Sequence, residues 1–236
     1  MKRFPWGLTA ATAVLLAVLI GLGVWQTQRM GWKNHLIAQA EAAAARPAQP
    51  IETVLAEAAE LDFRKVVLAC PGLASAPYVE LQTILDGEAG VRLISACRPA
   101  GVTQAFLIDR GFVSDSVTTR PQVGASTLPT AFVGQLRHAP EPPAMAPPPS
   151  NGRFYARDEE AMAAALEVQG PVSDLLIFAE TPTNPELAAL RPVAPPAAFS
   201  NNHLGYAVTW FGLALVLAGF YVAMVMRRFR KAPDQA

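Results

Sequence analysis

The stretch LGYAVTWFGLALVLAGFYVAMVM, residues 204–226, decides the fold because it contains no charged side chain and few polar ones. A second stretch of this kind, LTAATAVLLAVLIGLGV, occupies residues 8–24. Each stretch has about 20 residues, and at roughly 1.5 Å of rise per residue a helix of that length crosses the ~30 Å hydrocarbon core of a bilayer. A buried helix of a water-soluble domain shows a polar stripe at helical spacing, which both stretches lack. We therefore predict two transmembrane helices.

The ends of both stretches support this assignment, because amphipathic aromatic residues collect at the membrane–water interface. These residues are Trp6, Trp25, Trp32, Tyr206, Trp210 and Tyr221. The alternative for the first stretch is a cleaved signal peptide, since Met1-Lys2-Arg3 is basic. Its apolar run is, however, longer than the roughly 7–15 residues typical of such a peptide.

Basic residues after the second stretch predict the orientation, because positive charge favours the cytoplasmic side of a membrane. These residues are Arg227, Arg228, Arg230 and Lys231. The C-terminus is therefore expected in the cytoplasm, and two spans then place the N-terminus there as well. The expected organisation is a cytoplasmic tip and first span at 1–28, an extracytoplasmic domain at 29–200, the second span at 201–226 and a basic cytoplasmic tail at 227–236.

The composition limits the choice of partner. Of the 236 residues, 52% are apolar and 16% are charged, and 19 Lys and Arg balance 19 Asp and Glu. The segment 29–200 carries 13 basic and 18 acidic residues, a net charge of −5. A surface that binds nucleic acid has basic residues clustered on a folded segment, and this sequence has no such cluster. We expect membrane lipid, and no nucleic acid, as a partner.

The segment between the spans predicts an α+β domain. Helical periodicity occurs at 51–61 and 157–168, whereas short β-like runs separated by turn residues lie at 65–69, 78–85, 91–96, 105–109, 130–137 and 171–179. Residues 140–149 hold six prolines and predict an extended surface loop. Short strands at this spacing favour an antiparallel β meander or a partly closed barrel, with short helices added. The fold class is therefore α+β, with one extracytoplasmic domain flanked by two transmembrane helices.

The sequence carries no local signature of an enzyme. It contains no G-x-S-x-G, phosphate-binding loop, H-E-x-x-H, C-x-x-C or C-x-x-C-H motif. The histidines, His35, His138 and His203, lie far apart in the sequence. We predict that the protein is not an enzyme.

Cys70 and Cys97 each end an expected strand. An even number of cysteines on the outer side of a membrane favours a disulfide, and two buried thiols are the alternative. In a plain meander the strand at 78–85 would separate them too far to bond, and barrel closure would remove that obstacle. Both readings stay open.

Two polar motifs have a structural and a functional interpretation. In Arg110-Gly111 we expect a turn glycine beside an arginine that pairs with Asp109 or another carboxylate, with an anion-binding arginine as the alternative. In Asn201-Asn202-His203 the asparagines suit a helix cap at the start of the second span. His203 is then either an anchor at the membrane interface or an axial ligand of haem iron.

Four segments together resemble the Surfeit locus protein 1 family of cytochrome c oxidase assembly factors. They are LGVWQTQRMGWK at 22–33, DRGFV at 109–113, GQLR at 134–137 and NNHLGYAVTWF at 201–211. The chain departs from the family pattern at Phe112, where tryptophan is usual, and at Cys70 and Cys97. These cysteines make a disulfide more plausible as a feature of a subfamily.

The resemblance implies a non-enzymatic assembly factor of a haem-copper oxidase that helps haem a enter the largest subunit. It implies transient haem a binding with His203 as the axial ligand of the iron, and Asn202, Tyr206 and Trp210 as neighbours of the cofactor. Haem a synthase is a second expected partner. The short basic N-terminus favours a bacterial plasma membrane, with the central domain in the periplasm. The alternative function is a two-span membrane receptor or tether whose outer domain binds a ligand or protein.

Overall fold

The structure, a computed structural model, describes residues 4–57, 59–138, 142–193 and 202–229. The chain divides into two compact units. One consists of Met1–Gln39 with Ala198–Ala236, and the other is Ala40–Ala197. The expected α+β class with two candidate spans is confirmed.

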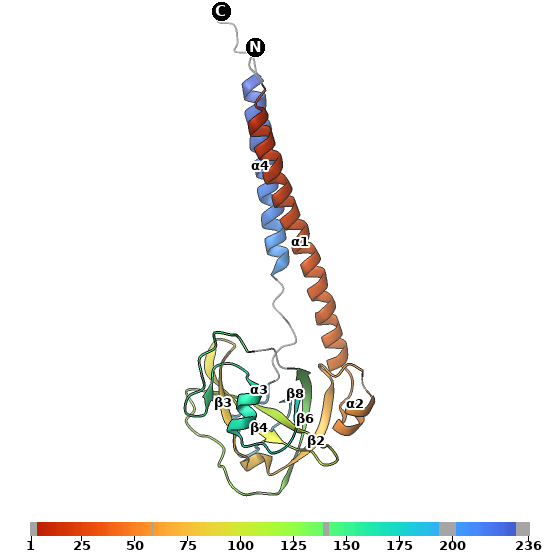
Figure 1. The fold of residues 1–236 in the computed structure, drawn as a ribbon, viewed down its shortest axis with the longest axis vertical. Helices are drawn as coiled ribbons and strands as arrows, with labels where there is room; N and C mark the ends of the chain where they lie inside the picture. Colours follow the sequence, from red (N-terminus) through yellow and green to blue (C-terminus); the bar gives the residue numbers. More distant parts are fainter. Residues whose placement is uncertain (1–3, 58, 139–141, 194–201, 230–236) are drawn as a thin grey trace, which may run out of the picture. The chain divides into compact units, whose positions relative to one another are not determined.

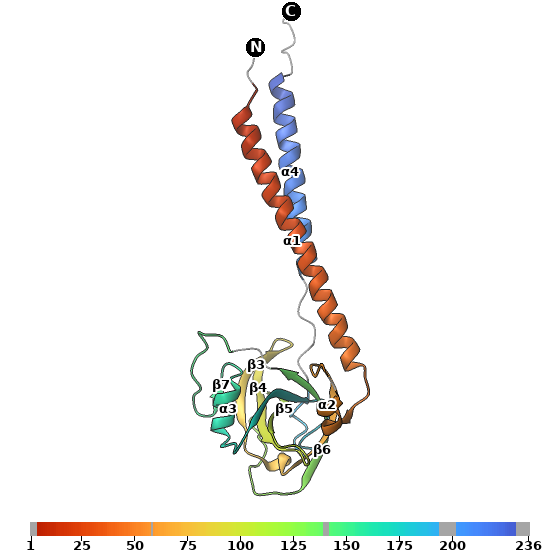
Figure 2. The ribbon, with the colours of Figure 1, turned by 45° about the vertical axis from the view of Figure 1, so that its right-hand side comes forward.

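The first unit contains most of the long apolar helix α1 (Trp6–Ala44) and all of a second one, α4 (His203–Phe229), and the two lie side by side (Figures 1 and 2). Both are long and apolar enough to cross a membrane. The helix α1 continues well past residue 28, where the sequence placed the end of the first span. The reason is its alanine-rich second half, since alanine is the strongest helix former.

The second unit is built on one mixed sheet. Its eight strands among the described residues are β1 (Gln49–Pro50), β2 (Lys65–Pro71), β3 (Val79–Leu85), β4 (Glu88–Cys97), β5 (Ala105–Ser114), β6 (Pro129–His138), β7 (Arg153–Phe154) and β8 (Val172–Ala179). Their order in the sheet is β1-β2-β6-β8-β5-β4-β3-β7. Short helices accompany them: α2 (Ile51–Glu57), η1 (Leu73–Ser75) and α3 (Glu159–Ala165).

The expected meander is present only in β3-β4-β5. There Asp86 and Gly87 both adopt positive φ, which is the geometry of a tight hairpin turn. The strand β8 runs parallel to β5 and antiparallel to β6, while β1 pairs parallel with β2 and β7 with β3. Long-range pairing of this kind has no local sequence signal. Residues 142–149, the described part of the expected proline-rich loop, form neither helix nor strand.

The central strands β5 and β8 are buried on both faces. Alternate residues of β5 and β8 point into different clusters, with Ile108 and Ile177 on the face covered by α2, and Leu107 and Leu176 on the other. The second cluster includes Met162 of α3. Burial on both faces explains why these strands read as continuous apolar runs in the sequence.

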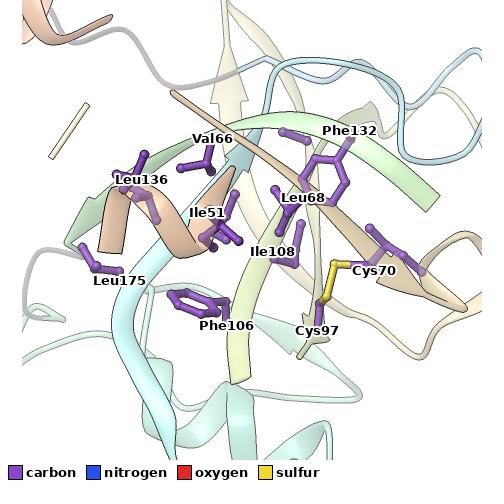
Figure 3. Close-up of a cluster of buried hydrophobic side chains, with 14 residues drawn as sticks. Ile51, Val66, Leu68, Cys70, Cys97, Phe106, Ile108, Phe132, Leu136 and Leu175 are labelled. Atoms are coloured by element: carbon purple, nitrogen blue, oxygen red, sulfur yellow. A yellow bond between two sulfur atoms is a disulfide. The ribbon is translucent and has the colours of Figure 1, made fainter. Parts of the chain in front are cut away.

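Cys70 and Cys97 are joined by a disulfide with a Cα–Cα distance of 5.7 Å. Figure 3 shows the bond at one end of the core cluster that receives Ile51 of α2. The strands β6, β8 and β5 separate β2 from β4 in the sheet order, so the sheet must curl to bring the two ends together. The strand expected to lie between the cysteines, β3, pairs with the opposite edge of β4 and does not separate them.

Candidate functional site

The candidate site lies where two apolar runs end. His203 is the first residue of α4, and Gln26 follows the apolar run of α1. The Nδ1 atom of His203 is 2.6 Å from Oε1 of Gln26 in a half-buried hydrogen bond. Gln26 belongs to the motif at 22–33, but the sequence does not indicate its partner, because only the pairing of the two helices brings it to His203.

Three further contacts fix the antiparallel pairing of α1 and α4. A Cβ atom on Gly23 would lie 2.6 Å from Cε1 of Phe211, so the absence of a side chain lets Phe211 pack there. Towards the other end, the hydroxyls of Thr9 and Tyr221 are 2.6 Å apart. The rings of Phe4 and Phe229 stack with centroids 6.3 Å apart. The two apolar runs therefore coincide along the pair, as two spans of one bilayer require.

The other residues expected around His203 take different positions. Asn202 precedes the helix, and its carbonyl accepts a hydrogen bond from the Tyr206 amide at 3.4 Å. An open depression of the surface is lined by Asn202, Gly205, Tyr206 and Thr209. His203 is not among the residues lining it, and Trp210 is half-buried two turns along α4. Asn201 lies outside the described residues.

The motif after the first span also has a defined local structure. The guanidinium of Arg29 stacks on the ring of Trp32, with 4.0 Å between its central carbon and the ring centroid. Such a cation–π contact favours a charged side chain next to an apolar surface. The interfacial position of this segment stays a prediction.

The surroundings of His203 limit the kind of metal centre that this side chain could serve. Among them, no three His, Cys, Asp or Glu side chains gather in a way that would hold a metal ion. A porphyrin supplies four ligands of its own, so one imidazole is enough to hold its iron. No hydrogen bond to Nε2 of His203 occurs within the described part of the chain, whereas Nδ1 is engaged by Gln26. The other histidines lie elsewhere, with His138 in the sheet unit next to Asp62 at 3.1 Å.

The Asp109-Arg110-Gly111 motif has a structural role in the sheet unit. Arg110 is fully buried and donates hydrogen bonds to Ala74 O at 3.1 Å, Thr183 Oγ1 at 3.3 Å and Ser95 Oγ at 3.4 Å. Burial lowers the pKa of Arg110 to about 10. The expected pairing with a carboxylate is wrong for the part of the chain that the structure describes, because the acceptors of Arg110 there are neutral groups of three separate segments.

Gly111 lies inside β5 rather than in the expected turn. Its φ of 127° and the close approach of Arg191 and Pro192 leave no room for a side chain. Phe112 and Arg191 exchange two backbone hydrogen bonds, both of 2.8 Å. The glycine thus allows the segment that leads towards α4 to lie across the strand.

Asp109 accepts hydrogen bonds from two other arginines, Arg92 at 2.6 Å and Arg157 at 2.9 Å. Together with Arg137, they surround the ring of Phe178, at 4.9 to 5.9 Å from its centroid. Burial is the main cause that lowers the pKa of Arg137 to about 10. The arginines of this group contact Asp109 or the ring of Phe178, so we assign the group a structural role in the sheet unit.

Comparison with known proteins identifies the family. Residues 13–215 match the SURF1 family. The chain is 28% identical to Surfeit locus protein 1 of Homo sapiens over 229 residues, which cover 88% of this chain and 74% of the human protein. It is 24% identical to a SURF1-like protein of Monosiga brevicollis over 230 residues, or 92% and 87% of the two chains. With Surfeit locus protein 1 of Mus musculus the identity is 27% over 233 residues, or 90% and 74%. Since the match covers most of its length, the chain belongs to the SURF1 family.

Proposed function

We propose that this protein assists the insertion of haem a into the largest subunit of a haem-copper oxidase and binds haem a transiently through His203. Membership of the SURF1 family implies a cytochrome oxidase assembly factor, which fits a protein that is not an enzyme. The observation that carries the haem proposal is the hydrogen-bonded pair of His203 and Gln26 at the ends of two apolar runs.

The chemistry of this position suits haem a. When bound, haem a would supply an iron atom, which the imidazole of His203 would hold through a ring nitrogen. Its apolar tail and polar propionates have opposite solvent preferences, so a site where two apolar helices become polar gives each part a suitable medium. We propose that His203 would hold the iron and that Asn202, Tyr206 and Trp210 would contact the cofactor. Asn202 and Tyr206 already share one surface depression.

We further propose that both termini lie in the cytoplasm and that the sheet unit lies in the periplasm of a bacterium. Arg227 and Arg228 in the last turn of α4 support this orientation. The disulfide of Cys70 and Cys97 supports an oxidising compartment. Reporter fusions at residue 120 and at the C-terminus should give periplasmic and cytoplasmic signals, respectively. A cytoplasmic signal at residue 120 would contradict the orientation.

A deletion strain tests the function. Loss of the protein should lower the haem a content of the isolated oxidase and its activity, and the wild-type gene should restore both. The His203→Ala gene should restore them less well, at equal abundance of the protein. A receptor or tether would leave the haem a content and activity of the oxidase unchanged on deletion. Co-purification of the largest oxidase subunit and of haem a synthase with the tagged protein tests the proposed partners.

A further inference from the structure

We propose that Gln26 is a positioning residue that holds His203 as the Nδ1-protonated tautomer and so leaves the lone pair of Nε2 available for iron. The inference rests on the proposed function for its biological meaning, and on a single contact for its geometry. That contact joins Nδ1 of His203 to Oε1 of Gln26 at 2.6 Å.

The chemistry of the two groups determines the tautomer. The Oε1 atom of a glutamine amide accepts hydrogen bonds and cannot donate one. The nitrogen that faces it must therefore carry the proton, and this is Nδ1. In a neutral imidazole the second nitrogen then has a free lone pair, which is the form that binds a metal. With the opposite tautomer, Nε2 would carry hydrogen and could not bind iron.

The surrounding helices hold the amide in place. Gln26 lies about one turn beyond Gly23, where α1 approaches α4 closely enough for Phe211 to fill the space of a glycine side chain. One turn into α4, Ala207 is almost fully buried. This close packing fixes the helix spacing beside the hydrogen bond. A half-buried hydrogen bond is also less weakened by competition with water than an exposed one.

The neutral charge of Gln26 matters for a protein that must release its cargo. A carboxylate partner on Nδ1–H raises the basicity of the imidazole and strengthens its bond to the metal. An uncharged amide orients the ring without strengthening the bond between the imidazole and the metal in this way. Gln26 therefore suits a site that holds a haem in a fixed orientation and gives it up again.

The tautomer can be measured in the protein without haem. The full chain with ¹⁵N-labelled histidine, purified in detergent, should show Nδ1 of His203 protonated and Nε2 unprotonated, with the signal assigned by its loss in His203→Ala. In Gln26→Leu the preference of His203 for the Nδ1-protonated form should be lost. Gln28→Leu is the matched control, since Gln28 is exposed on the same helix. A wild-type His203 protonated on Nε2, or a preference that survives in Gln26→Leu, overturns the inference.

Haem titration supplies the second test. Gln26→Leu should bind haem a roughly 10- to 100-fold more weakly than the wild type, as expected for loss of a partner of a metal-bound histidine. Gln26→Glu should bind at least as well as the wild type and should lower the reduction potential of the iron, a shift that a purely structural role would not cause. Equal affinity in Gln26→Leu and an unchanged potential in Gln26→Glu would overturn the role in ligation. If His203→Ala binds haem like the wild type, the proposed function fails, whereas the tautomer measurement still decides the role of Gln26.

Discussion

Arg92 and Asp109 form an ion pair in the interior of the sheet unit, with Nε 2.6 Å from Oδ2 and the carboxylate fully buried. Arg157 shares the same oxygen at 2.9 Å. Asp109→Asn would leave two buried guanidinium groups without their counter-charge, at a cost of about 3 kcal/mol or more in the free energy of unfolding. Denaturant unfolding of the full chain in detergent measures this loss.

The control for this change is Asp115→Asn, because the one hydrogen bond to its carboxylate among the described residues is an exposed one of 3.4 Å from Gln82. It should change the free energy of unfolding by less than about 0.5 kcal/mol. Equal stability of the Asp109 and Asp115 variants would contradict the role given to the buried ion pair.

Glu80 joins two distant segments to β3, through hydrogen bonds of 2.7 Å from Arg120 and 2.9 Å from Arg153. Burial alone raises the pKa of Glu80, but the two arginines outweigh it, so the pKa lies below the ordinary 4.5. The folded state therefore favours the carboxylate. The contribution of this carboxylate to the free energy of unfolding is present above about pH 4.5 and is lost as the pH falls through the lowered pKa.

From this sign we predict that Glu80→Gln lowers the free energy of unfolding by about 1 kcal/mol at pH 7, and by less as the pH falls below 4.5. Unfolding curves of the full chain at several pH values test it. The control Glu57→Gln changes an exposed residue at the end of α2. A difference between wild type and Glu80→Gln that stays constant from pH 7 to pH 3 would contradict the prediction.

The disulfide between Cys70 and Cys97 closes a loop with a sequence separation of 27 residues. Restricting the unfolded chain in this way adds roughly 3 kcal/mol to the free energy of unfolding. The double variant Cys70→Ala/Cys97→Ala should therefore unfold at a lower concentration of denaturant. Alkylation of the denatured protein should modify neither cysteine until reductant is added. Complete alkylation without reductant would show that the bond does not form in the cell.

The pairing of α1 with α4 depends on the small residue Gly23. Gly23→Val places methyl groups against Phe211, and overpacking of this kind costs roughly 1–3 kcal/mol. Gly21→Val is a matched control two residues away, because no atom lies within 4 Å of the position of its Cβ. Thermal unfolding in detergent should show a lower midpoint for Gly23→Val only. Equal midpoints would contradict the close approach at Gly23.

Local patterns in the sequence predicted the elements well. The run at 65–69 became β2 with two further residues, and the run at 130–137 became β6 with one more residue at each end. The apolar stretches at 8–24 and 204–226 both lie within long helices. These features depend on periodicity and hydropathy, which neighbouring residues determine.

Contacts between distant residues were not predictable in the same way. Nothing local indicates that β8 inserts between β5 and β6, or that Arg110 finds acceptors on three segments. The choice between a disulfide and free thiols depended on the same unknown order of strands. Likewise, His203 was recognisable as a candidate from its position at the start of an apolar run, but its partner Gln26 lies 177 residues away in the sequence.

The haem a content of the purified protein tests the central claim most directly. The full chain and its His203→Ala variant would be isolated in detergent from cells that make haem a, with equal amounts of protein compared by absorption and pyridine haemochrome analysis. We predict that His203→Ala loses most of the bound haem a and shifts the Soret band of the remainder, while its membrane insertion and abundance stay near wild type. Full haem content with an unchanged spectrum would show that His203 is an interfacial anchor and not the ligand.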